Sequence, residues 1–411
     1  MHGTIGAREE VAALSAVRHR LQHIDAMRAL ALLGVIVMNI GSMVMFVNGR
    51  ETMSSATPAD LGVAAADLLV LLGKARSCFA FLFGAGFAIM MLRAEASGRD
   101  FSAFFTRRMA VLLLFGLINQ IFLFWGDILV TYSLLGFALM LVMAKSTRWL
   151  LRAGLALALL PPLVHALIEI AVGHPLTGLI EPDRMAESAR RLSAYSSPSY
   201  FDAVVENARS GAMEHVLGTA HMLVYDFSVF GLFLLGSWAV QTGILIRPGD
   251  HRPLLRRIVW VTLPLGLLLS GLNASSLLGL KAQGLLRAAV TASFVGVPIL
   301  AFAYLALLGL WFSRSAKRLQ AFLAPAGRMS LTNYLLSGTF GCWYFYGYGL
   351  GQLRAHSLAG LTLVGVGIWL AVVLFSHAWL SLFPMGPAEF LWRRWSNPAA
   401  RKPARQAASA A

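Results

Sequence analysis

Cysteine and charged side chains are both scarce in this sequence. Its 411 residues include two cysteines, and charged residues make up 13% of the chain, against about 25% in a soluble globular protein. Cys78 and Cys342 lie in apolar runs without the spacing of metal ligands. This placement argues against a disulfide framework and predicts no metal site. The shortage of surface charge excludes a chain of soluble globular domains.

Long apolar runs fill most of the sequence instead. Apolar residues make up 58% of the chain, and a helix needs about 20 of them in succession to cross a bilayer. The sequence therefore predicts an all-α polytopic membrane protein, a bundle of about ten transmembrane helices. The predicted spans are Ala29–Val47, Ser77–Leu92, Met109–Trp125, Ile128–Ala144, Trp149–Val172, Gly218–Ile246, Ile258–Asn273, Ala288–Phe312, Met329–Leu350 and Leu358–Phe383.

The distribution of positive charge predicts the orientation. The net charge is +15, with 34 lysines and arginines against 19 acidic residues. Most of the basic residues fall in alternate loops, as the positive-inside rule requires if the N-terminus and the C-terminus are both cytoplasmic. The excess charge then reflects topology and contact with anionic membrane lipids, and no nucleic-acid partner is expected.

The chain is predicted to form one transmembrane domain over residues 24–395. A cytoplasmic tail over residues 1–23 precedes it, and a disordered cytoplasmic tail over residues 396–411 follows it. One outer loop, at about residues 173–217, is long and holds two amphipathic stretches, Asp183–Ala194 and Ser199–Met213, which are expected to cover the outer face.

Two further short helices are predicted beside the spans. Leu61–Gly73 is apolar but ends in Lys-Ala-Arg, so it is interpreted as a re-entrant or interfacial helix leading into the second span. Pro387 and the aromatic and arginine residues that follow it predict a helix on the cytoplasmic surface.

Polar side chains within spans are costly and often functional. Asp25, Arg28 and Asn39 fall on one helical stripe, from the predicted cytoplasmic boundary to about mid-membrane. The stripe could guide an anionic ligand, with Arg28 on a phosphate. The alternative is an interfacial Asp–Arg pair together with an asparagine that only packs.

The predicted outer half holds a second group. His165 and Glu169 are four residues apart and share a helical face. The carboxylate could orient the imidazole as a general base, or the two side chains could form a hydrogen bond with each other that has only a structural role. Asp127 lies in a tight apolar hairpin and must find a partner, for which Arg76 is a candidate. Asn119 lies nearby on the preceding span.

Arg328 and Asn333 open the ninth predicted span. Asn333 shares a helical face with two serines, Ser330 and Ser337. Polar residues at this spacing either bind a ligand or form hydrogen bonds between helices.

Five motifs carry a family resemblance. They are Ile24–Arg28 leading to Asn39, Phe81–Gly86, Phe124–Leu129, Gly327–Tyr334 and Gly386–Arg393. In this order and over nearly the whole chain they resemble the YeiB-like bacterial membrane proteins, a family with a domain of unknown function. That family is distantly similar to transmembrane acyltransferases, which move acyl groups from cytosolic acyl-CoA to glycans across the membrane.

The resemblance implies a bacterial inner-membrane, multi-pass protein with Arg28 near the path of the acyl donor. It also implies that the outer polar residues lie near the acceptor. The chain departs from the pattern in one respect. The related acyltransferases use a membrane-embedded histidine near the first two spans, and this chain has Asn39 there. It also has Asn119 where many YeiB-like proteins have histidine.

Three functions are therefore compared. The first is acyl transfer from acyl-CoA, as co-substrate and with no bound cofactor, to a glycan or lipid-linked acceptor. In it, Asp127 or His165 with Glu169 would act as base, and Asp25, Arg28, Asn39, Arg76, Asn119, Arg328 and Asn333 would bind ligands. The second is a transporter or flippase of a small or amphiphilic solute. The third is a membrane scaffold without catalysis. The sequence leaves the substrate and the oligomeric state open.

Overall fold

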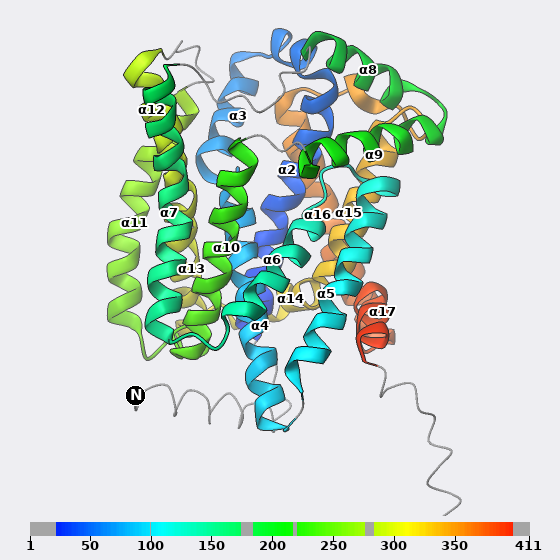
Figure 1. Cartoon of the computed structure of the whole chain (residues 1–411). Coiled ribbons are helices and arrows are strands. Elements are labelled where there is room, and N and C mark those ends of the chain that lie inside the picture. The colour runs from blue at the N-terminus through cyan, green and yellow to red at the C-terminus, as the bar shows by residue number, and fades with distance from the viewer. Residues whose placement is uncertain (1–21, 99, 174–183, 217–219, 276–282, 398–411) are drawn as a thin grey trace, which may run out of the picture.

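The computed structural model describes residues 22–98, 100–173, 184–216, 220–275 and 283–397. Helices make up nearly all of this part of the chain, and no strand occurs within it. Most of the long helices run roughly along one common axis (Figure 1). The predicted all-α fold is confirmed. Of the two tails predicted over residues 1–23 and 396–411, residues 1–21 and 398–411 lie outside the described residues.

Eight segments of the described chain are long and apolar enough to cross a membrane, as a multi-pass protein requires. Two of the ten predicted spans correspond to shorter helices, α6 with 14 residues and α15 with 16 residues. The exact number of crossings and the orientation stay predictions. The long helices are α2 Gln22–Ser54, α4 Lys74–Ala96, α5 Phe101–Ile118, α7 Thr147–Val172, α10 Ala220–Gln241, α11 Arg252–Ala274, α13 Gly296–Arg314 and α16 Leu358–Leu382.

Helix α2 lies at the centre of the packing. It contacts α4, α14 (Lys317–Arg328), α15 (Ser330–Phe345) and α16. Its side chains Ala26, Leu32 and Met43 are fully buried. In contrast, α7 and α11 lie at the periphery, where α7 packs against α10 and α12 (Gly284–Ala292) and α11 packs against α13. Asp25, Arg28 and Asn39 of this helix are partly buried.

Helices α4 and α10 cross at very short range because glycine lies at the contact. A Cβ on Gly236 would lie 1.9 Å from the carbonyl oxygen of Phe81, and one on Gly84 would lie 2.1 Å from that of Phe233. The hydroxyl of Ser237 donates to the carbonyl of Gly84 at 2.9 Å. Small residues that let backbones approach are typical of helix contacts in membranes.

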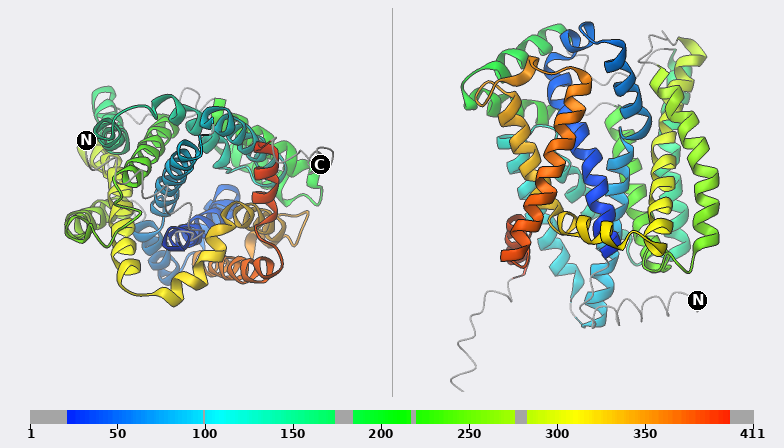
Figure 2. Two further views of the ribbon diagram at one scale, coloured as in Figure 1. Left: turned by 90° about the horizontal axis from the view of Figure 1, so that it is seen from below. Right: turned by 180° about the vertical axis from the view of Figure 1, so that it is seen from behind.

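The two ends of the bundle are covered differently. Helices α8 (Arg184–Ser196) and α9 (Tyr200–Val216) lie across one end (Figure 1), which confirms the two predicted amphipathic helices. Helix α17 (Pro387–Ser396) lies near the other end, where α2 begins and where α14 crosses the bundle obliquely (Figure 2). The first and last described helices thus share one end, called here the α17 end. The end under α8 and α9 is called the cap end.

The segment before α4 forms a helix of its own, α3 (Pro58–Val70), as predicted. Thr57 and Asp60 form a reciprocal capping box at its start, and Pro58 occupies the first turn. Its last turn is closed by Lys74, whose buried ammonium group donates to the carbonyl of Leu68 at 2.5 Å. Helix α3 packs against α11 and α16.

Candidate functional site

A cavity of about 340 Å³ lies at the α17 end of the bundle. Residues from α2, α4, α5, α6, α14, α15 and α17 line it, so helices from both halves of the sequence enclose it. Four arginines and two carboxylates face it, leaving a surplus of two positive charges. The charged lining residues are Asp25, Arg28, Arg93, Arg108, Arg328 and Glu389. Such a surplus suits an anionic ligand.

Arg28 is held by α2 and α4 together. Its Nη1 donates to Asp25 Oδ1 at 3.2 Å, one helical turn earlier, and its Nη2 donates to the carbonyl of Leu82 at 3.4 Å. The absence of a side chain at Gly86 makes room for it, since a Cβ there would lie 2.8 Å from Nη2. The motif containing Gly86 thus shapes the cavity wall.

Arg108 is fixed by α17. Its guanidinium lies over the ring of Trp392, 3.6 Å from the centroid, and Trp392 Nε1 donates to the Arg108 carbonyl at 2.8 Å. Glu389, one turn earlier in α17, accepts from the backbone amides of Leu331 and Thr332 at 2.9 and 3.1 Å. It therefore caps the free N–H groups at the start of α15. Helix α17 closes part of the cavity wall.

The remaining lining is largely aromatic and aliphatic. Phe83 meets Tyr132 edge to face at 5.2 Å, and Phe87 meets Phe105 in the same way at 4.2 Å. A site lined by both arginines and aromatic rings matches a ligand that carries both anionic and apolar parts.

Tyr334 connects this cavity to Asp127. Tyr334 lines the cavity, and its hydroxyl donates to Asp127 Oδ1 at 3.3 Å while it accepts from the backbone N–H of Ile128 at 3.1 Å. Asp127 is 3% exposed. Its Oδ1 also accepts from Asn119 Nδ2 at 2.6 Å, and its Oδ2 accepts from the N–H of Val130 at 2.9 Å.

Asn119 and Tyr334, and not Arg76, are the side chains that pair with Asp127. The guanidinium of Arg76 instead lies 3.5 Å above the centroid of the Tyr225 ring. Asn119 can reach Asp127 because it begins a π-helical turn, η1 (Asn119–Leu123), that joins α5 to the hairpin. π turns are rare and often mark functional positions.

The other predicted residues are spread over the molecule. Asp25, Arg28 and Arg328 line the cavity and are brought together with Tyr334, but Asn39 is not part of its lining. His165 and Glu169 lie on α7, away from the cavity lining, with Nε2 and Oε1 3.7 Å apart. Glu169 accepts from the Thr291 hydroxyl at 2.7 Å.

Asn333 forms hydrogen bonds between helices, which was the second of its two predicted roles. Its Nδ2 donates to the Ala326 carbonyl at 3.1 Å and to the Ser376 hydroxyl at 2.8 Å, which joins α15 to α14 and α16. Within the described chain no cluster of three or more His, Cys, Asp and Glu side chains could hold a metal ion.

Arg93, Arg108, Tyr132, Tyr334 and Trp392 were missed as site residues by sequence reasoning. The two arginines contributed only to the count of basic residues in loops. The available signal was that Tyr334 and Trp392 lie in two of the motifs that carry the resemblance.

Comparison with known proteins gives the family. A family model described as a protein of unknown function (DUF418) matches residues 239–398. The uncharacterized protein YxaH of Bacillus subtilis is 31% identical over 390 residues, covering 91% of this chain and 93% of the relative. The chain belongs to the YeiB-like family.

Two further bacterial relatives match over almost their full length. YeiB of Escherichia coli, also uncharacterized, is 29% identical over 93% of this chain and 98% of its own. An uncharacterized 39.9 kDa protein in the amylase 3′ region of Bacillus acidopullulyticus is 28% identical over 92% of this chain and 94% of its own. These relatives support a bacterial origin, and the family resemblance seen in the motifs is confirmed.

Proposed function

We propose that the cavity at the α17 end binds a phosphate-bearing acyl donor of the acyl-CoA type. We further propose that the protein transfers the acyl group to an outer-side or lipid-linked acceptor. The observation that carries the proposal is the set of four arginines beside an aromatic wall in one cavity. Arginine pairs with phosphate in a bidentate manner and keeps its charge when partly buried.

The predicted orientation agrees with this choice of donor. If the basic loops face the cytoplasm of a bacterial cell, the arginines lie on the side from which a soluble acyl-CoA arrives. The polar cap end then lies on the acceptor side. The inner plasma membrane is part of the proposal for the same reason.

Tyr334 and Asp127 are assigned the proton transfer. The acceptor oxygen or nitrogen attacks the thioester carbonyl carbon, a new C–O or C–N bond forms, and the C–S bond breaks. The acceptor proton passes to the Tyr334 oxygen as Tyr334 gives its own proton to Asp127, and the departing thiolate takes up a proton to leave free CoA. General base action of this kind accounts for about 10²- to 10⁴-fold in rate.

The test uses the purified full chain in liposomes with labelled acetyl-CoA. We expect CoA binding, slow release of free CoA and labelled product with glycan or lipid acceptors. Arg108→Gln should weaken binding, whereas Arg107→Gln, which changes an exposed neighbour outside the cavity lining, should not. Unchanged affinity in Arg108→Gln would remove the donor site. If a labelled small or amphiphilic solute crosses the bilayer and no CoA is released, the result would favour the alternative function, a transporter or flippase.

A further inference from the structure

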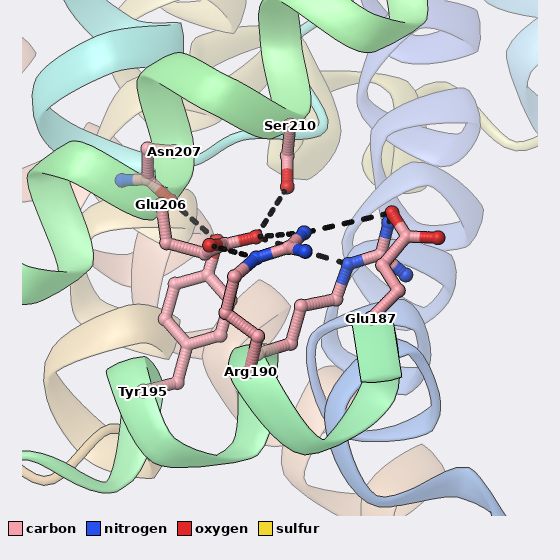
Figure 3. Close-up of polar contacts among 7 residues, drawn as sticks. Glu187, Arg190, Tyr195, Glu206, Asn207 and Ser210 are labelled. Carbon is pink, nitrogen blue, oxygen red and sulfur yellow. Dashed lines mark hydrogen bonds and ion pairs between the residues drawn. The ribbon is translucent and has the colours of Figure 1, made fainter. Parts of the chain in front are cut away.

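Helices α8 and α9 are joined into one rigid unit, called here the cap. Arg190 donates to both carboxylate oxygens of Glu206, at 3.0 and 3.2 Å, and the Ser210 hydroxyl donates to the same group at 3.2 Å (Figure 3). Glu206 is buried, and the bond to its carboxylate raises the pKa of Arg190. Arg191 pairs with Glu187 beside them.

The cap is anchored to the bundle at two places. The Arg191 guanidinium lies over the Phe46 ring, 3.6 Å from the centroid, and Phe46 in turn stacks on Trp125 of the hairpin at 3.7 Å. On the other side Tyr195 stacks on Tyr346 at 4.3 Å. The cap therefore holds a fixed position over the hairpin that carries Asp127.

Helix α9 also binds the π turn directly. Asn207 Nδ2 donates to the Ile121 carbonyl at 3.4 Å, and the Tyr200 hydroxyl donates to the Phe122 carbonyl. Gly211 lets α9 come close, since a Cβ there would lie 2.6 Å from the side chain of Gln120. Tyr195 orients Asn207 by donating to its Oδ1 at 2.9 Å.

These contacts have a physical cause. A π turn followed at once by an extended residue leaves carbonyls without partners within their own helix, and such groups are costly in an apolar setting. Helix α9 supplies the donors. Because the same turn begins with Asn119, whatever holds the turn also sets the position of the amide that binds Asp127.

We propose that Tyr200 and Asn207 are positioning residues for the Asp127–Tyr334 pair. The cap fixes the π turn, the turn places Asn119, and Asn119 places the carboxylate next to the tyrosine that lines the cavity. The inference rests on the proposed function only in giving that pair a role in proton transfer.

The test measures hydrogen exchange at the amide of Val130, which donates to Asp127 Oδ2. Tyr200→Phe and Asn207→Ala, singly and together, are compared with Val205→Ala, an exposed site on the same helix. The double variant should exchange about five- to tenfold faster at this amide, the effect of losing about one or two hydrogen bonds. Val205→Ala should match the wild-type protein.

Asn119→Ala serves as the positive control and should give the same increase. Tyr200→Phe keeps the ring, so it tests the idea even if the double variant fails to fold. Wild-type exchange at Val130 in Tyr200→Phe and in a folded Asn207→Ala protein would overturn the inference.

Turnover gives a second readout. The variants should lower kcat and leave the affinity for acetyl-CoA at the arginines unchanged. If the wild-type protein neither binds nor uses acetyl-CoA, the proposed function fails. The exchange experiment still decides whether the cap positions Asp127.

Discussion

Two substitutions of Asp127 should separate its structural role from its chemistry. Asp127→Ala removes the acceptor for three donors, on Asn119, Val130 and Tyr334. Each buried donor left without a partner costs about 1–3 kcal/mol, so the free energy of unfolding should fall by about 3 kcal/mol or more. Activity should be lost as well.

Asp127→Asn should be tolerated by the fold. The Oδ1 of Asn119 has no hydrogen-bond partner within the described residues. Rotating the Asn119 amide by a half-turn would present that oxygen to the new amide group, while the new carbonyl keeps the Val130 N–H. The Tyr334 hydroxyl, which donates to Oδ1, loses its acceptor in this arrangement. One hydrogen bond and the charge are therefore lost, at about 1–3 kcal/mol, which is less than the loss in Asp127→Ala.

The assay is chemical unfolding of the three purified proteins in mixed micelles, followed by turnover in liposomes. We expect Asp127→Asn to lie between the wild-type protein and Asp127→Ala in stability and near Asp127→Ala in activity. Equal stability of the two variants would refute the hydrogen-bond reasoning. Full turnover by a stable Asp127→Asn protein would remove the carboxylate from the mechanism.

Three further predictions concern packing and the cavity. Gly236→Ala should lower the unfolding temperature because its Cβ would lie 1.9 Å from the Phe81 carbonyl, whereas Gly367→Ala meets nothing within 4 Å and should not. Glu389→Gln should destabilise the start of α15, seen as faster amide exchange at Thr332, since the negative carboxylate interacts favourably with the positive end of the helix dipole. Binding of acetyl-CoA should weaken as salt rises from about 0.05 to 0.5 M. The Debye length is about 10 Å at 0.1 M and shortens as salt is added, so the attraction between the arginines and the phosphates is screened. Salt-independent affinity would argue against a site held by arginines.

Much of the fold follows from the sequence because membrane helices are set by local composition. The apolar runs, the two amphipathic segments of the long loop and the helix at Pro387 each occur where their residues predict them. The length of a span is less well predicted. The predicted run Met329–Leu350 ends as a helix at Phe345, because Tyr346 turns to an extended conformation.

The site was predictable in part, at Asp25, Arg28 and Arg328, because charge at a span boundary is visible in sequence. The cavity itself was not, because it depends on how α5 and α17 meet. The Arg108 guanidinium lies over the ring of Trp392, a residue 284 positions away in the chain, and this contact cannot be read from the sequence. The pairing of Asp127 also eluded prediction, since nothing in the sequence indicates a π turn at Asn119.

The π turn has a consequence for comparing relatives. A π turn amounts to one extra residue inserted into an α-helix. A relative that lacks this residue would keep α5 regular, and every side chain beyond the deletion would be rotated by about 100° around the helix axis. The hairpin aspartate would then be turned away from the residue at the position of Asn119. A one-residue gap aligned with 119–123 therefore marks relatives whose hairpin carboxylate must find a different partner.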